Sequence, residues 1–209
     1  MLYLSGVPTD MAGVGFMAQP NAANLIPADT WWAMDNGCFS KAHEFNLERF
    51  INFARRRLAT DGDRCLFVVC PDVAFDAAGT LARWHEYRDA IKQLGRPVAF
   101  VTQDGMGMED VPWEDIDALF VGGSTEWKTG HESGALMAEA KRRGLWVHVG
   151  RVNSLRRLRA AYSLGADSCD GTFLKYAPTE NRERMREWFR QMDESPVMAL
   201  PHVDAGREA

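Results

Sequence analysis

Short, continuously apolar runs recur along the chain. They include residues 66–70, 99–101, 118–121 and 145–149, the last of which contains His148. Strands with apolar residues on both faces are typical of parallel sheets covered by helices, whereas half-exposed strands alternate apolar and polar positions. The runs therefore predict buried parallel strands.

Segments with helical periodicity separate these runs. Residues 47–58 place apolar side chains at i, i+3, i+4, i+7 and i+11, which forms one stripe along a helix. A second stripe over residues 81–94 closes at Gly95, a residue type that often ends helices. Two further helices are predicted to end at Gly144 and Gly165. The predicted order is strand, helix, strand, helix.

Seven strands are expected, near residues 2–5, 30–34, 65–71, 97–102, 117–122, 145–149 and 166–170. Residues 15–17 are the candidate for an eighth, although residues 6–30 form no clear element and also fit an active-site loop. The alternation fits a (β/α)8-type (TIM-like) barrel, complete or incomplete, or an open doubly wound sheet. The barrel is favoured because polar residues follow nearly every strand, and a barrel gathers strand ends at one face.

Length and hydropathy predict the domain organisation. The 209 residues suffice for one substantial core and are short for two, so a single barrel domain is expected over residues 1–192. Residues 193–209 lack periodicity and are expected to form a C-terminal tail. No run of about 18 apolar residues occurs, and the start lacks the features of a signal peptide, so a cytoplasmic protein without membrane contact is expected.

Composition limits the chemistry. The net charge of −5 argues against a general nucleic-acid-binding surface, since phosphate contacts need clustered Lys and Arg. Positive charge is nevertheless concentrated from Arg151 onward, where both exposed helix faces and phosphate contacts fit the pattern. The four cysteines form no CxxC pair, and no cluster has metal-ligand spacing. Neither a disulfide nor a metal nor another cofactor is expected.

The segments that follow the predicted strands are rich in carboxylates, amides and glycines. In chain order they are Asp35-Asn36-Gly37-Cys38-Phe39, Asp72, Gln103 within residues 102–105, Gly122-Gly123, Val149-Gly150-Arg151 and Gly165-Ala166-Asp167-Ser168-Cys169-Asp170. Because the carboxyl ends of parallel strands meet at one face of a barrel, these residues are expected to converge on one site.

This ordered set resembles the queuine-type tRNA-guanine transglycosylase superfamily. In that family an Asp-Ser-Gly-Gly-aromatic motif is followed by a base-recognising Asp, a Val-Gln-Gly loop, a Gly-Gly loop, a His- or Gly-containing strand end and a Gly-x-Asp-x-x-Asp segment with the nucleophile. The match covers roughly residues 31–172, and the order of the motifs gives it weight. The CxCxxC…H zinc module of the tRNA enzymes is absent, and the chain is far shorter.

These departures make the chain most similar to the compact DNA guanine transglycosylases of bacteriophages and bacterial genomic islands. The resemblance implies exchange of guanine in DNA for a free 7-deazaguanine base, in a bacterial cell or a phage-infected host. A homodimer and a separate partner protein are both compatible with it. The alternatives are tRNA as the substrate, a sugar-phosphate lyase or isomerase, and a non-catalytic base-binding protein. The lyase hypothesis is disfavoured because the sequence has no obvious Schiff-base lysine at a strand end.

Base exchange with retention at the sugar needs two displacements, so the protein must supply a nucleophile. A carboxylate suits the oxocarbenium-like centre, and Asp170 is the candidate. Asp35 is the candidate acid and base, because repulsion between neighbouring carboxylates raises one pKa. A turn or cap role competes with each assignment: Asp170 precedes Gly171, and Asp35 begins an Asp-Asn-Gly turn sequence.

Guanine presents two N–H donors and one carbonyl acceptor on its Watson–Crick edge. Asp72 is expected to accept from the donors, while Gln103 and the amides of Gly122 and Gly123 donate to the carbonyl. Phe39 is expected to stack on the ring. Turn, loop and core roles compete with each of these assignments.

A base in duplex DNA must be flipped out to reach such a pocket, unless the substrate is single-stranded. Arg151 and Lys128 are the candidates for holding the flanking phosphates. His148 joins the substrate-binding candidates because it lies near the same strand end. A lone histidine inside an apolar strand is, however, more often a core residue.

Overall fold

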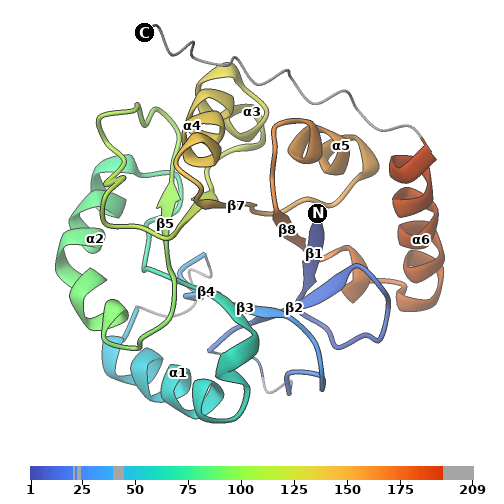
Figure 1. Ribbon diagram of the computed structural model, residues 1–209, viewed down its shortest axis with the longest axis horizontal. Coiled ribbons are helices and arrows are strands. Elements are labelled where there is room, and N and C mark those ends of the chain that lie inside the picture. Colours follow the sequence, from blue (N-terminus) through green and yellow to red (C-terminus); the bar gives the residue numbers. More distant parts are fainter. Residues whose placement is uncertain (21, 23–24, 40–44, 195–209) are drawn as a thin grey trace, which may run out of the picture.

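The computed structural model describes residues 1–20, 22, 25–39 and 45–194. Eight parallel strands in this part of the chain form a closed barrel, in which each strand pairs with the next and β8 pairs with β1 (Figure 1). They are β1 (Leu2–Ser5), β2 (Val14–Ala18), β3 (Trp32–Met34), β4 (Cys65–Val69), β5 (Val98–Thr102), β6 (Ala118–Val121), β7 (Trp146–Val149) and β8 (Ser168–Gly171). The predicted (β/α)8-type barrel is confirmed, and its ring of strands is closed.

Helices surround the strands (Figure 1). They are α1 (Leu47–Asp61), α2 (Ala77–Lys92), α3 (Thr125–Lys128), α4 (His131–Arg142), α5 (Leu155–Ser163) and α6 (Pro178–Glu194), with 3₁₀ turns η1 (Gly62–Arg64) and η2 (Phe173–Lys175). Within the described ranges, no helix follows β1, β2 or β5, so the alternation is less regular than in an ideal barrel. None of the described helices combines the length and apolar character that a membrane span requires.

The eighth strand is β2, at the position of the candidate segment 15–17. All five of its residues are buried, and its register joins Tyr3 to Val14 and Phe16 to Trp32. Gly15 is required by this closure, because a Cβ atom there would lie 2.6 Å from the Trp31 carbonyl oxygen. A glycine inside so short a strand weakens the sequence signal, which explains why the segment also resembled a loop.

Two apolar layers form the core. One lies between the strands and the helices, and the other fills the barrel with inward-facing side chains such as Leu4, Met17, Phe67, Val69 and Val101. Alternate residues of each strand therefore face either the helices or the barrel interior, as expected for a packed (β/α)8 barrel.

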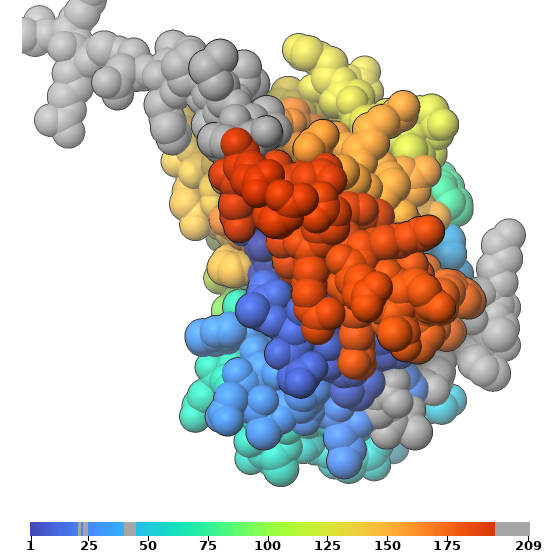
Figure 2. All heavy atoms as spheres, turned by 90° about the vertical axis from the view of Figure 1, so that its right-hand side faces the viewer, coloured from blue at the N-terminus to red at the C-terminus, as the bar shows by residue number. Residues whose placement is uncertain are grey.

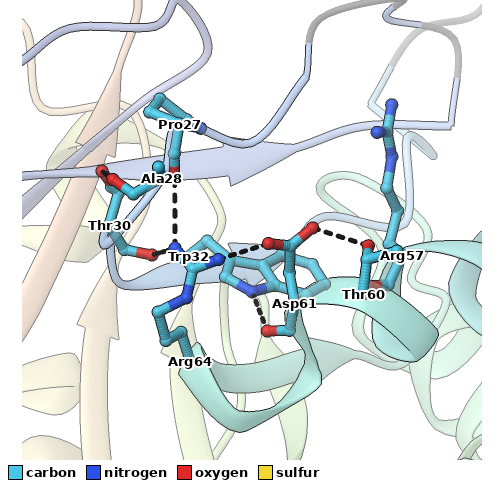
Figure 3. Close-up of polar contacts among 8 residues, drawn as sticks. All are labelled: Pro27, Ala28, Thr30, Trp32, Arg57, Thr60, Asp61 and Arg64. Atoms are coloured by element: carbon cyan, nitrogen blue, oxygen red, sulfur yellow. Dashed lines mark hydrogen bonds and ion pairs between the residues drawn. The ribbon is translucent and has the colours of Figure 1, made fainter.

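At the amino-terminal face of the barrel, Arg64 joins two neighbouring segments (Figure 3). Its guanidinium donates to the carbonyl oxygens of Pro27 at 3.1 Å and Thr30 at 3.2 Å and pairs with Asp61. The Trp32 indole N–H donates to the Asp61 carbonyl oxygen at 2.8 Å. These bonds join the end of α1 to the loop before β3, at the face of a barrel that is usually structural rather than catalytic.

The carboxy-terminal helix α6 covers the barrel beside its first strands, as Figure 2 shows for the orange-red α6 and the blue N-terminal residues. In agreement, a Cβ atom at Gly13 would lie 3.1 Å from the Phe189 ring. The helix includes Asp193 and Glu194, which the sequence assigned to the tail. The rest of the predicted tail, residues 195–209, lies outside the described residues.

Candidate active site

A cavity of about 310 Å³ opens at the carboxyl ends of the strands, which is at the small end of the range for ligand sites. All the predicted site residues line it except His148 and Lys128. The lining residues are Gln19, Asp35, Asn36, Phe39, Val69, Asp72, Ala74, Phe75, Val101, Gln103, Phe120, Gly122, Gly123, Gly150, Arg151, Asn153, Asp170 and Thr172. The strand ends therefore converge on one pocket.

A larger groove, of about 710 Å³, lies elsewhere on the molecule. It is lined by Met1, the loop before β2 and residues of α5 and α6, and it contains none of the strand-end carboxylates. We therefore take the smaller cavity as the candidate active site, because reactive groups converge there and the larger groove has no comparable set.

Asp170 projects into the cavity from β8, with a side chain that is 23% exposed. Its Oδ1 accepts the backbone N–H of Arg151 at 2.8 Å and lies 3.4 Å from His148 Nε2. Within the described ranges, no donor makes a hydrogen bond to Oδ2. One carboxylate oxygen is thus held by the protein, and the other is available for chemistry.

The backbone at Arg151 is strained in a way that serves Asp170. Its φ of 59° lies in the left-handed region, which costs a non-glycine residue about 1–3 kcal/mol. In this conformation the Arg151 N–H points at the Asp170 carboxylate, while the Val152 N–H donates to the Asp170 carbonyl oxygen at 2.6 Å. The loop after β7 therefore fixes both the backbone and the side chain of Asp170.

Asp35 follows β3 and shares the cavity with Asp170. Burial is the main cause that raises the pKa of its carboxyl group from 3.8 to about 6, and the charges of Asp170 and Asp72 add to it. The hydrogen bonds from Gln19 Nε2 at 2.8 Å and from the Gly37 N–H at 3.4 Å oppose the rise. A carboxyl group with this pKa can both donate and accept a proton near neutral pH.

Asp72 follows β4, and both of its carboxylate oxygens are held. Asn36 Nδ2 donates to Oδ1 at 2.9 Å, and Gln103 Nε2 donates to Oδ2 at 2.7 Å. Burial raises the pKa of Asp72, and these hydrogen bonds together with the charge of Arg83 oppose that rise. Two amide donors fix the plane of the carboxylate, which is suited to accepting paired N–H groups from a ligand.

Gln103 makes two contacts that the sequence did not predict. It is only 1% exposed, its Oε1 accepts the Phe75 N–H at 2.9 Å, and one N–H of its amide is committed to Asp72. The side chain lines the cavity, and its shown contacts orient Asp72 and the loop that bears Phe75. The sequence could not predict this, because the partners come from a neighbouring strand end.

The two glycines after β6 are not equivalent. The Gly122 N–H donates to the Thr102 carbonyl oxygen at 3.0 Å, and a Cβ atom at Gly122 would lie 2.7 Å from that oxygen. This amide is therefore used in strand pairing, which corrects the prediction that it contacts a ligand. The Gly123 N–H makes no hydrogen bond within the described ranges, so it is the amide of the pair that can serve a ligand.

Two exposed aromatic rings flank the cavity. Phe39 and Phe75 are 54% and 52% exposed, and their ring centroids are 6.1 Å apart in an edge-to-face arrangement. The Arg151 guanidinium lies 4.5 Å from the Phe39 ring centroid and 5.2 Å from that of Phe75, and it donates to the Gly123 carbonyl oxygen. A planar ligand could replace the guanidinium against either ring.

Sequence reasoning missed Phe75 and Gln19 as parts of the site. Phe75 lies three positions beyond Asp72 with a left-handed φ of 65°, and only its closeness to a strand end could have marked it. Gln19 directly follows β2, the strand that the sequence left uncertain. Both residues were missed because their segments lack periodicity.

Lys128 and His148 are the predicted residues that do not line the cavity. Lys128 is 6% exposed, its Nζ donates to the Gly150 carbonyl oxygen at 2.7 Å, and burial followed by the charge of Arg151 lowers its pKa to about 8. Its amine therefore supports the loop after β7 instead of pointing into the cavity. His148 is fully buried beneath Asp170, so its predicted direct contact with a substrate is also corrected.

Replacing Asp35 by asparagine should raise the free energy of unfolding at pH 7 by about 1–3 kcal/mol. Folding raises the pKa of this carboxyl group, so the stability that it contributes when protonated is present below pH 3.8 and is lost as the pH rises through about 6. Chemical denaturation at pH 7 and at about pH 4 should show a gain that shrinks at the lower pH. No gain at pH 7 would contradict the assigned environment of Asp35.

Comparison with known proteins supports the fold and gives no information on the chemistry. No protein-family model and no curated protein sequence matches the chain. The fold is similar to that in the crystal structure of the Amycolatopsis orientalis BexX/CysO complex, with 17% sequence identity, coverage of 95% of this chain and 93% of the matched chain, and a TM-score of 0.50. At this identity the likeness supports the barrel alone. The chain is therefore, by fold, a (β/α)8-type barrel protein.

Proposed function

We propose that the protein is a transglycosylase that exchanges guanine in DNA for a 7-deazaguanine base through a covalent aspartyl-sugar intermediate. The observation that supports it most is that one cavity brings together Asp170, whose Oδ2 accepts no hydrogen bond from the described residues, and the largely buried carboxyl group of Asp35. Burial raises the pKa of Asp35 to about 6, which suits an acid and base. DNA as the substrate rests on the resemblance to the compact DNA guanine transglycosylases, because the sequence lacks the zinc module of the tRNA enzymes.

In the first step, Asp170 Oδ2 attacks the deoxyribose C1′ as the bond from C1′ to guanine N9 breaks. The bonding electron pair leaves with the base, and protonated Asp35 donates a proton to it. The Arg151 N–H continues to hold Oδ1 while Oδ2 becomes esterified. This step inverts the configuration at C1′ and leaves Asp35 ionised.

In the second step, a free 7-deazaguanine takes the place of guanine. The Asp35 carboxylate accepts its N9 proton, N9 attacks C1′, and the bond from C1′ to Oδ2 breaks. The second inversion restores the original configuration, and both carboxyl groups return to their starting states. No further reactant is required.

Base recognition is assigned to the groups that line the cavity. Asp72, fixed by Asn36 and Gln103, accepts the two N–H groups of the Watson–Crick edge. The Gly123 N–H donates to the base carbonyl, and Phe39 stacks on the ring. None of these contacts involves position 7, which suits a pocket that accepts both guanine and its 7-deaza relative.

The alternative of a Schiff-base lyase receives no support from the cavity. No lysine is among its described lining residues, and the amine of Lys128 is held by the Gly150 carbonyl oxygen outside it. Carboxylates are the reactive groups that line the cavity, and these favour glycosidic chemistry.

Replacing Phe39 by alanine should raise the KM for DNA by about tenfold with a smaller effect on kcat, because base stacking on an aromatic ring contributes about 1–3 kcal/mol. Trp31→Ala is a matched control, since Trp31 is also 54% exposed but precedes β3, at the other end of that strand. Steady-state kinetics with labelled DNA measure both constants. Equal KM values for the two variants would count against the stacking role.

The substrate is tested with DNA and tRNA that contain labelled guanine, each incubated with and without a 7-deazaguanine. We expect label release from DNA that depends on the added base. Release from tRNA alone would transfer the activity to tRNA, and release from neither would refute base exchange.

A further inference from the structure

A line of polar side chains crosses the otherwise apolar interior of the barrel and ends at Asp170. It consists of Trp146 and His148 from β7 and Ser168 and Asp170 from β8, and we call it the polar column. Leu4, Phe67, Val69 and Phe120 belong to the apolar cluster around it. Buried polar groups in such surroundings are costly unless they are hydrogen-bonded, so their partners are informative.

In the polar column, Trp146 donates to Ser168, and Ser168 contacts His148. Ser168 is fully buried, and its Oγ accepts the indole N–H of Trp146 at 2.8 Å. The same Oγ lies 2.8 Å from Nδ1 of His148, its cross-strand partner. Within the described ranges, His148 Nδ1 is the one acceptor within hydrogen-bond distance of this hydroxyl, so the Ser168 proton points to Nδ1.

The tautomer of His148 follows from this arrangement. If Nδ1 bore a proton, in the other neutral tautomer or in the imidazolium, the Ser168 hydroxyl would be a buried donor without an acceptor. Nδ1 is therefore unprotonated, and the single ring proton is on Nε2, 3.4 Å from Asp170 Oδ1. The rings of Phe67 and Phe120, with centroids 5.3 and 4.5 Å from that of His148, enclose the imidazole.

We infer that Trp146 and Ser168 fix the tautomer of His148, and that His148 thereby acts as a positioning residue for Asp170. Its Nε2–H and the Arg151 backbone N–H approach the same oxygen, Oδ1, so that Oδ2 is left without a donor among the described residues. A separation of 3.4 Å is long for a hydrogen bond, and such bonds often tighten when a substrate binds. The catalytic consequence rests on the proposed function, whereas the tautomer does not.

The tautomer is measured directly by long-range proton–nitrogen NMR on protein with ¹⁵N-labelled histidine. The His148 signal is identified by its absence from the His148→Gln protein. We expect an unprotonated Nδ1 and a protonated Nε2 in the wild type, and loss of this single state in Ser168→Ala. A protonated Nδ1 in the wild type would overturn the inference, even if the protein proved inactive in base exchange.

The kinetic test compares two fully buried serines. Ser168→Ala should lower kcat by about tenfold with an unchanged KM, the loss typical of a hydrogen bond that supports a charged group. Ser133→Ala removes a hydroxyl that bonds to the carbonyl oxygens of Trp127 and Gly130 outside the polar column, and it should leave kcat unchanged. His148→Gln, which can accept from Ser168 and donate to Asp170, should retain more activity than His148→Leu. Equal kcat for the two serine variants at comparable melting temperatures would overturn the positioning role.

Discussion

The Asp170→Asn protein should fold normally and lose base exchange, with label release from DNA lowered by about 10⁴-fold or more. Asparagine keeps an oxygen that can accept the Arg151 N–H, so the geometry of the β7–β8 end is preserved. It has no anionic oxygen to form the bond to C1′, so the first displacement cannot occur. Single-turnover release of labelled guanine measures the loss.

The control for this variant is Asp115→Asn. Asp115 is a half-exposed carboxylate that pairs with Lys92 at 2.9 Å and precedes β6, at the opposite face of the barrel. Its replacement should leave label release unchanged. Substantial release by Asp170→Asn would exclude Asp170 as the nucleophile.

Replacement of Asp35 by asparagine should slow label release by about 10²–10⁴-fold, the usual contribution of a positioned acid or base. The first step requires the protonated carboxyl group, whose pKa is about 6. Single-turnover release by the wild type should therefore be fastest below pH 6 and fall as the pH rises through that value. The Asp35→Asn variant should lack this decline, because it has no group that titrates at this position.

The kinetics of the Asp35→Asn variant are to be read together with its free energy of unfolding. A variant that is more stable and less active indicates that the native carboxyl group is kept for function at a cost in stability. A wild-type profile without a decline near pH 6, or a variant with an unchanged profile, would contradict the acid role of Asp35.

Much of the fold follows from the apolar runs. Strands such as β5 and β6 are continuous stretches buried on both faces, and parallel pairing follows from that pattern. β2 was the exception, because its close contact with β1 and the loop before β3 requires Gly15, and glycine gives no strand signal. Closure of the barrel depends on contacts that no local pattern contains.

The sequence predicts those site residues whose position depends only on the end of a strand. Asp35, Asp72 and Asp170 come from three different strands and share one cavity, as the barrel geometry requires. The role of His148 was not predictable, because its position one residue before the strand end places it beneath the cavity. Lys128 was misjudged because its amine turns inward to the Gly150 carbonyl oxygen, a contact that sequence spacing does not reveal.

The covalent intermediate tests the central claim most directly. Wild-type protein should be incubated with a guanine-containing oligonucleotide without an incoming base, quenched in acid and analysed by intact-protein and peptide mass spectrometry. We predict a protein–DNA adduct that has lost guanine, is attached at Asp170 and disappears when 7-deazaguanine is added before the quench. Release of guanine without an adduct, or an adduct at another residue, would contradict the account.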